Sequence, residues 1–421
     1  MKTNFLKVAL ESEMIQQAAV NDEEMNRELD IIEQGSQIQF EELEDVDKVI
    51  DAADSINSLT DAAGEEPVES TVKVLTVATE SILEKIGMSS VYVISVESDD
   101  PKSTFERIKE IAIKLWEKIV ALFEHVYEAI KDFMAVAFSA SVRIEKAAIE
   151  RLKVSRKLEG SPKRTTYENE QLAKSLNTGE KIGLVTSYDR VIDLVEATID
   201  ANYARPGKKA LDILNSTLEY IEKSGSESAI SSMRNDLVRV IKEAYVERSF
   251  KKISNSDSVE VTGLSTVGIE TYTTPILTGG YGGILVVPTT PETISKLTFR
   301  ILPVDEIEEV STNSIMVSDT HEQNQLITQV IRCCSFIRKF ESNVMPTIDQ
   351  IDKQLKSGLK KLKQSVKNNN DSDKEIKEAI KLLGFALPKI AQGTHHRTFA
   401  FALNTSRNIL KHIDYSIAAW K

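Results

Sequence analysis

The sequence predicts a mainly α fold: a multi-helix body with a small β-rich insertion and an acidic, loosely structured N-terminal region. Three observations lead to this prediction. Apolar residues recur at spacings of three and four along most of the chain, as they do on one face of an amphipathic helix. Between residues 253 and 303 this spacing gives way to β-branched residues interspersed with Thr, Gly and Pro. The acidic residues, finally, are concentrated at the N-terminus.

The acidic N-terminal region, which we call the acidic leader, comprises residues 1–70. It contains nineteen Asp or Glu residues and four Lys or Arg residues, a net charge of −15. The whole chain of 421 residues carries −13, so residues 71–421 together sum to +2. A strongly acidic segment on a nearly neutral body is typical of interaction tails and removable propeptides. Because the leader has only two aromatic residues, Phe5 and Phe40, we expect it to be loosely held or only locally helical.

Shifts in composition divide the chain into five expected segments. Residues 64–70 combine Gly, Pro and acidic residues, which predicts an exposed linker. The β-branched run at 91–96 predicts an extended arm. The segments are the acidic leader at 1–70, a linker with the extended arm at 71–100, a helical domain at 101–252, the β-rich insertion at 253–304 and a C-terminal helical region at 305–421.

The clearest predicted helix begins at Pro101. Asp100 is a suitable N-cap, and Pro is favoured at the first helical position. Over residues 105–137 the apolar side chains follow at steps of three and four, which predicts a helix buried along one face. A second and more charged helical piece is expected at 142–158, and the Gly-Ser-Pro sequence at 160–162 should end it.

Further helices are predicted on both sides of the insertion. Their apolar stripes lie near 188–199, 211–221, 230–244, 326–366, 372–387 and 394–420. Pro346 should kink the longest of them. Within the insertion, the glycine-rich run at 279–283 lacks the Lys-Ser/Thr of a P-loop and the G-x-G-x-x-G order of a dinucleotide site. It therefore predicts a tight turn rather than phosphate binding.

No catalytic constellation is visible in the sequence. It contains no G-x-S-x-G elbow, and its five histidines form no H-E-x-x-H motif. We therefore expect neither an enzyme nor a cofactor or metal site, and we interpret the histidines as helix-surface residues. The histidines are His125, His321, His395, His396 and His412.

The sequence also excludes a disulfide-stabilised protein and a membrane-spanning protein. The only cysteines, Cys333 and Cys334, are adjacent, which rules out a disulfide framework and predicts two small helix residues with one facing inward. The most apolar stretch, residues 111–142, is interrupted by charged side chains too often to span a membrane. We expect no membrane partner.

Near the C-terminus, one predicted helix carries a run of lysines opposed by a single acidic residue, Asp352. Such a face could contact nucleic-acid phosphates non-specifically, although no aromatic residue interleaves it to read bases. A solvated helix face is the simpler interpretation, and both stay open here. The lysines are Lys353, Lys356, Lys360, Lys361, Lys363 and Lys367.

A short motif, a small residue followed by any residue, Glu and Ser, recurs before the first strong helix. Its copies place Glu11, Glu80 and Glu97 ahead of a serine, with a looser copy at 67–70. These glutamates are candidate processing sites, since a protease could reach an extended backbone in an exposed part of the chain. The alternative is that the motif arises by chance in a chain rich in Ala, Ser and Glu.

These features resemble the internal-head, or inner-body, structural proteins of giant tailed bacteriophages of the phiKZ-like group. The leader begins with the sequence VALES at residues 8–12, and Ala/Ser-x-Glu motifs cluster ahead of the folded part. An aromatic-rich helix at 113–138 then runs into a charged helix that ends RLKVSRKLEG at 151–160. The resemblance covers residues 1–160.

The resemblance implies a non-enzymatic virion structural protein that assembles in the prohead, is trimmed by a prohead protease after Glu, and resides in the capsid interior. Its partners would be other head proteins (capsid, portal or inner-body proteins), the prohead protease and packaged DNA, and it would occupy the host cytoplasm before assembly. The residues alone leave a second interpretation open, a cytoplasmic helical adaptor that uses its acidic region to engage a basic partner.

Overall fold

The computed structural model describes residues 67–88, 101–178, 182–199, 227–245, 249–304, 314–343 and 395–420, with single residues or short runs between 48 and 64, 209 and 216, and 346 and 357. These residues form a mainly helical body with a small sheet, as the sequence predicts. The arm expected at 91–96 and the helix expected at 372–387 lie outside the described residues.

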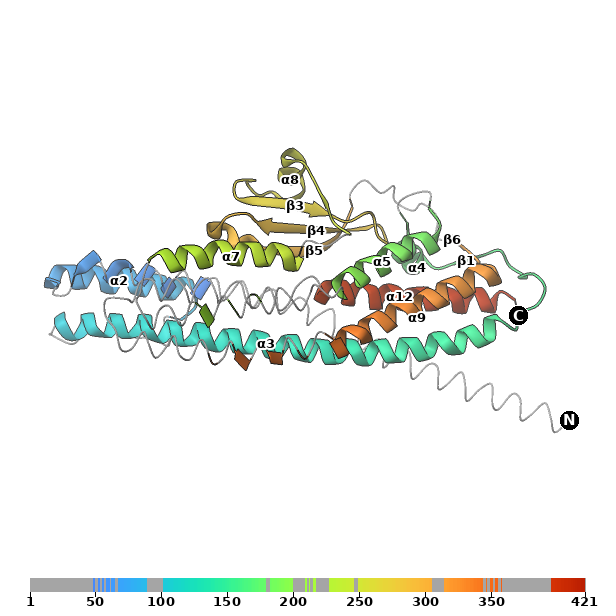
Figure 1. The fold of residues 1–421 in the computed structure, drawn as a ribbon, viewed down its shortest axis with the longest axis horizontal. Coiled ribbons are helices and arrows are strands. Elements are labelled where there is room, and N and C mark those ends of the chain that lie inside the picture. The colour runs from blue at the N-terminus through green and yellow to red at the C-terminus, as the bar shows by residue number, and fades with distance from the viewer. Residues whose placement is uncertain are drawn as a thin grey trace, which may run out of the picture.

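The longest element is α3 (Pro101–Ser155), a single helix of 55 residues. At a rise of 1.5 Å per residue it is about 80 Å long. Figure 1 shows it running along the whole length of the body. The prediction of two separate helical pieces was wrong here, because residues 138–141 contain neither Gly nor Pro and nothing interrupts the backbone hydrogen bonds.

The N-terminal half of α3 is covered by α2 (Glu69–Lys85). Val72, Leu75 and Leu83 of α2 are buried and belong to one apolar cluster with the α3 residues Phe105 and Leu115. The part of the acidic leader that the structure describes joins the same cluster. Its described residues between 48 and 63 are helical, and Val49, Ala53 and Ile56 are buried.

Four helices gather beside the C-terminal half of α3 (Figure 1). They are α4 (Glu170–Leu176), α5 (Leu184–Ile199), α9 (Thr320–Asn343) and α12 (His395–Ala418), and α9 and α12 contact α3 directly. On the facing side of α3 the buried residues include Ala137, Ala140 and Ala148, whose small side chains let neighbouring helices approach closely. The predicted stripes at 188–199 and 394–420 correspond to α5 and α12.

The β-rich insertion is confirmed. Strands β2 (Lys251–Lys252), β3 (Ile269–Thr273), β4 (Tyr281–Pro288) and β5 (Thr298–Pro303) form an antiparallel sheet in that order, with α8 (Asn255–Thr262) and the 3-10 helix η1 (Pro291–Lys296) in its connections. Helix α7 (Glu227–Tyr245) packs against β4 and η1. β4 lies between β3 and β5, and its residues Leu285, Val286 and Val287 are all buried.

Gly279 and Gly280 of the glycine-rich run form the predicted turn and attach the sheet to the helices, whereas Tyr281, Gly282 and Gly283 begin β4. Gly279 and Gly280 have φ values of 83° and 75°, which side chains with a Cβ rarely adopt, and the Leu277 N–H donates to the Tyr281 carbonyl at 2.7 Å. The Gly279 N–H in turn donates to the carbonyl of Asn177, just after α4, at 2.6 Å. Arg190 of α5 donates to the Ile276 carbonyl at 2.9 Å.

A second sheet consists of β1 (Thr166–Glu168) and β6 (Ser314–Met316), which pair antiparallel with Tyr167 opposite Ile315. These two strands were not predicted from the sequence. Three residues are too few for an alternating pattern to be recognised, and the pairing joins segments almost 150 residues apart.

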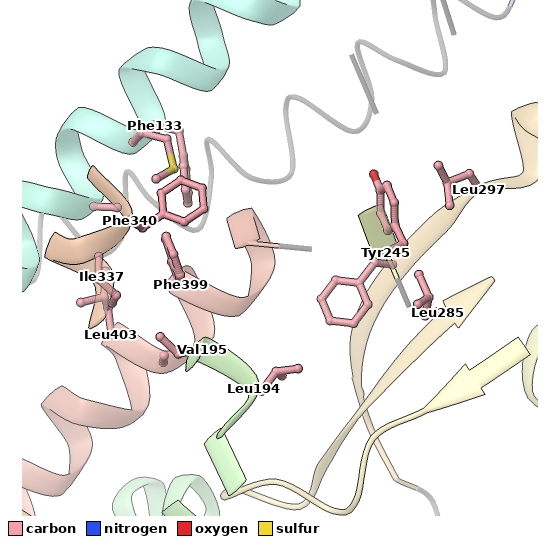
Figure 2. Packing of buried hydrophobic residues seen from close by; sticks show 14 of the residues in the cluster. Phe133, Leu194, Val195, Tyr245, Leu285, Leu297, Ile337, Phe340, Phe399 and Leu403 are labelled. Atoms are coloured by element: carbon pink, nitrogen blue, oxygen red, sulfur yellow. The ribbon is translucent and has the colours of Figure 1, made fainter. Parts of the chain in front are cut away.

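The core is continuous from the helices into the sheet (Figure 2). Phe133 of α3, Phe340 of α9 and Phe399 of α12 converge, and the rings of Phe340 and Phe399 meet edge to face at 5.1 Å between centroids. Farther along, Tyr245 of α7 lies near Leu285 of β4 and Leu297. All six residues belong to one buried cluster.

We predict that Leu115→Asp destabilises the body by about 3–5 kcal/mol, because Leu115 is fully buried and the new carboxylate would have no partner. Thermal or urea unfolding measures the change. The matched control on the same helix is Ala135→Asp at an exposed position, which should alter stability by less than about 1 kcal/mol. A Leu115→Asp variant that melts like the wild type would show that this face of α3 is not buried.

Candidate functional site

Of the three candidate processing residues, the structure describes Glu80 alone; Glu11 and Glu97 lie outside the described residues. Glu80 is exposed but occupies a helical position within α2. The expectation of an extended backbone is therefore wrong at Glu80, and a protease would have to unwind α2 to cut after it. The apolar contacts of α2 with α3 hold this segment helical.

Of the basic segment, the structure describes Lys353, which is exposed at a helical position. The other five lysines, Lys356, Lys360, Lys361, Lys363 and Lys367, lie outside the described residues. The described part of the chain therefore brings none of the predicted site residues together.

The burial of the histidines differs from the prediction. His321 is exposed as expected, but His395, His396 and His412 are buried, so the interpretation as helix-surface residues is wrong for these three. The side chain of His125 lies outside the described residues. Within the residues that the structure describes, no group of three or more His, Cys, Asp or Glu side chains could hold a metal ion.

His395 and His396 begin α12 and pack into the aromatic cluster where α3, α9 and α12 meet. The His396 ring stacks on Phe133 with centroids 4.0 Å apart, and the His395 ring lies 4.6 Å from that of Phe340. Burial lowers the pKa of His395 well below its usual value, so its ring is neutral at pH 7. Here the histidines act as packing residues.

Both cysteines of α9 are buried, not one of them as predicted. Burial raises the pKa of the Cys333 thiol to about 11. The thiolate is the reactive form of cysteine, so a protonated and enclosed Cys333 is inert at neutral pH.

His412 of α12 forms the centre of a buried polar network. Its Nδ1 lies 2.6 Å from the Tyr167 hydroxyl of β1, and its Nε2 lies 2.7 Å from the Ser318 hydroxyl. Gln323 of α9 extends the network: its amide donates to the Ser318 carbonyl at 2.8 Å and accepts from the Ser155 hydroxyl at 3.0 Å. The network therefore joins the end of α3 to β1, α9 and α12.

Two contacts at the surface reinforce this network. Arg151 of α3 donates two hydrogen bonds to Asp414 of α12, at 2.8 and 2.6 Å, in the bidentate geometry that favours arginine. The ring of Tyr167 stacks on that of Tyr415 at 4.6 Å between centroids.

Burial lowers the pKa of His412 to about 4, which keeps its imidazole neutral and able to accept one hydrogen bond and donate another.

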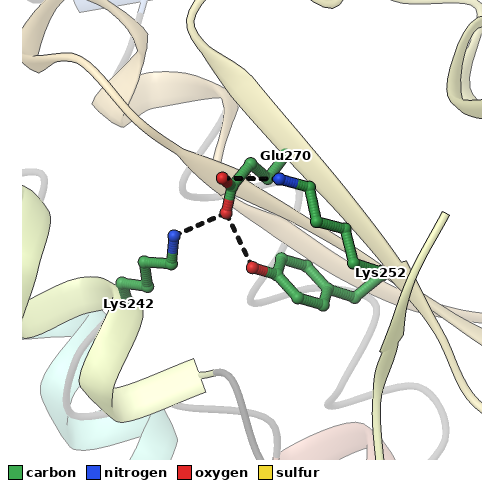
Figure 3. A network of polar contacts seen from close by, with 4 residues as sticks. Lys242, Lys252 and Glu270 are labelled. Carbon is green, nitrogen blue, oxygen red and sulfur yellow. Dashed lines mark hydrogen bonds and ion pairs between the residues drawn. The ribbon is translucent and has the colours of Figure 1, made fainter. Parts of the chain in front are cut away.

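A second network joins α7 to the sheet (Figure 3). Glu270 of β3 accepts hydrogen bonds from Lys242 of α7 at 2.6 Å, from Lys252 of β2 at 2.8 Å and from the Tyr272 hydroxyl at 2.7 Å. Partial burial works to raise the pKa of Glu270, but hydrogen bonds from the two lysines and the tyrosine outweigh it and hold the pKa at about 2. The carboxylate is therefore ionised throughout the physiological range.

Neither network was predicted from the sequence. The members of the first come from Ser155 to His412, and no local spacing connects residues so far apart. In the second, the alternation of Glu270 and Tyr272 within a strand puts both side chains on one face, which was the one available signal. Both networks link secondary-structure elements, and neither has the geometry of a nucleophile activated by a base.

Comparison with protein families finds a match that covers nearly the whole chain. Residues 15–410 match the model of a family described as phiKZ-like phage internal head proteins. Comparisons with curated proteins and with solved structures find no match. Among the described helices, none is long and apolar enough to cross a membrane.

We predict that Glu270→Gln lowers the free energy of unfolding by about 1 kcal/mol at pH 7, since it removes the charge that two lysines share. A carboxylate whose pKa is lowered on folding stabilises the protein above its unfolded pKa of about 4.3, and this contribution is lost as pH falls toward 2. The difference in free energy of unfolding between wild type and variant should thus shrink to zero as pH falls from 4.5 to 2. Exposed Glu260→Gln is the control and should show no such difference; a pH-independent gap for Glu270→Gln would contradict the assignment.

His412 is a base and not an acid, but we expect its stabilising contribution, like that of Glu270, to be lost as pH falls. His412→Gln should cost about 1–3 kcal/mol at pH 7.5, because the hydroxyls of Tyr167 and Ser318 lose a partner. A histidine whose pKa is lowered on folding stabilises the protein above its unfolded pKa of about 6.5 and loses that contribution as pH falls toward 4. The difference in free energy of unfolding between wild type and variant should therefore narrow as pH falls from 6.5 to 4. Chemical unfolding measures this difference. His395 is present in both proteins, so its contribution cancels. Exposed His321→Gln should leave the profile unchanged, and a gap that widens on acidification would refute the buried neutral imidazole.

Proposed function

The chain belongs to the phiKZ-like phage internal head proteins, and from this premise we propose that its acidic leader acts during head assembly and is then cut from the body by a prohead protease. The protein itself is a structural component of the phage head and resides in the capsid interior. The proposal concerns what the leader does there and where the chain is cut.

The proposal rests on the uneven distribution of charge along the chain. The leader holds −15 while residues 71–421 sum to +2, and all three candidate glutamates precede α3. A cut after Glu97 would remove the whole leader and leave α3 intact. A cut after Glu80 would divide α2, and a cut after Glu11 would remove just one of the nineteen acidic residues of the leader. Glu97 is therefore the favoured site, with Glu80 second.

We propose other head proteins, namely capsid, portal or inner-body proteins, as the partners during assembly. Packaged DNA is a further proposed partner, bound non-specifically by the basic segment from Lys353 to Lys367. Its support is the exposure of Lys353 and the presence of a single acidic residue, Asp352, between positions 351 and 370. Such contacts to phosphates supply affinity without reading bases.

The alternative is a helical adaptor of the host cytoplasm that engages a basic partner through the leader. The charge of −15 favours it as much as it favours an assembly role. The two differ in where the mature chain is found. Peptides from residues 101–421 in purified virions support the head role of this chain, and their absence from particles would support the adaptor.

We predict that the particle-borne protein begins at Ser98, or at Ser81 if the second site is used. N-terminal sequencing of the band from purified virions measures this directly. Glu97→Gln should block the favoured cut, whereas Glu80→Gln, the matched control, should leave it unchanged. An intact Met1 in mature virions rejects the processing proposal and leaves the structural role standing.

A further inference from the structure

We infer that the described residues between 48 and 88 form a docking segment, which stays bound to the N-terminal half of α3 after the chain between residue 88 and α3 has been cut. The inference rests on the proposed cut after Glu97, and it adds the interaction surface and its occupant. The leader would then be retained in part as a separate polypeptide, held by contacts that the structure describes.

The α2 part of the docking segment is buried along one face only. Its inward residues are Val72, Leu75, Thr76, Thr79 and Leu83, at steps of three, one, three and four. The opposite face lies in solvent: Val74 is 69% exposed, whereas its neighbour Leu75 is 4% exposed. This one-sided burial is the pattern of a helix that packs on a single partner surface.

The preceding part of the segment repeats the pattern. Val49, Ala53 and Ile56 are buried at steps of four and three, and Thr60 continues the stripe. These apolar side chains and those of α2 belong to the same cluster as the α3 residues Phe105, Ile108, Ile111 and Leu115. The acidic leader therefore ends in an amphipathic segment whose apolar face is part of the folded body.

The opposing stripe on α3 needs this cover. Phe105, Ile108 and Leu115 of α3 are at most 1% exposed and belong to the same cluster as the docking segment, so we expect its departure to expose part of this stripe to water. Contiguous apolar patches of that kind are uncommon on soluble proteins unless a partner covers them. A cut in the connection removes none of these contacts; it removes only the high effective concentration that the connection provides.

The rest of the body does not depend on the docking segment for its own core. From Phe133 onward, α3 is packed by α9 and α12, which follow every candidate cut in the sequence. Two parts of the fold thus pack on α3: the docking segment, which is N-terminal to the proposed cut, and α9 with α12, which are C-terminal to it. This arrangement allows the docking segment to be a separable partner of a body that stays folded.

The test uses the full-length chain with residues 89–97 replaced by the recognition sequence of a site-specific protease. After complete cleavage at micromolar concentration, gel filtration under native conditions should show both fragments in one peak. Elution of the N-terminal fragment apart from the body would overturn the inference.

Two neighbouring substitutions provide the matched comparison. In the cleavable chain, Leu75→Asp should release the fragment, and Val74→Asp should leave it bound, since Leu75 is buried and Val74 is exposed. Release by both, or by neither, contradicts the proposed surface. If circular dichroism shows that uncut Leu75→Asp is misfolded, Leu75→Ala replaces it and should weaken retention on dilution at least tenfold relative to Val74→Ala.

Failure here can be told apart from failure of the proposed function. An intact Met1 in virions would reject the processing proposal, while co-elution of the fragments in vitro would still establish the docking surface. Conversely, a new N-terminus at Ser98 together with fragments that separate would uphold processing and overturn retention. In virions, retention predicts peptides from residues 48–80 in equal amount to those of the body, and their depletion from particles carrying the cut chain contradicts it.

Discussion

The organisation of the molecule depends on the need to cover one apolar stripe along a helix of about 80 Å. Helix α3 buries Phe105 and Leu115 near one end and Ile144 and Ala148 near the other, and no other described helix approaches its 55 residues. The stripe is therefore covered in two parts: α2 packs on the first half, and α9 and α12 pack on the second. Because a single helix joins the two parts, the leader side and the body side of the protein share one core.

The polar networks complete this arrangement where elements that are distant in sequence meet. His412 and its partners connect the end of α3 to β1, α9 and α12, and Glu270 connects α7 to the sheet. A buried polar group is costly unless its hydrogen bonds are made, so such networks favour one arrangement of the helices over others of similar hydrophobic content.

Much of the fold could be predicted because its signals are local. The stripe after Pro101, the stripe of α12 and the change of residue type across β3, β4 and β5 each lie within one stretch of sequence. The break expected near residue 140 was wrong, because increased charge on a helix changes its exposure and not its continuity. The burial of His395 and His396 and the pairing of β1 with β6 depend on long-range packing, which spacing alone does not reveal. The candidate cut sites rest on sequence motifs, and Glu97 stays a prediction.

The central claim, that one unbroken helix joins the two parts of the protein, is best tested by a distance between spin labels on α3. Lys114→Cys and Lys153→Cys place labels at two exposed positions, and the native Cys333 and Cys334 are buried and should remain unlabelled. A continuous helix predicts a single narrow distance distribution near about 58 Å between the labelled backbones. A markedly shorter or two-peaked distribution would show that α3 is broken or folds back, and would contradict this account of the molecule.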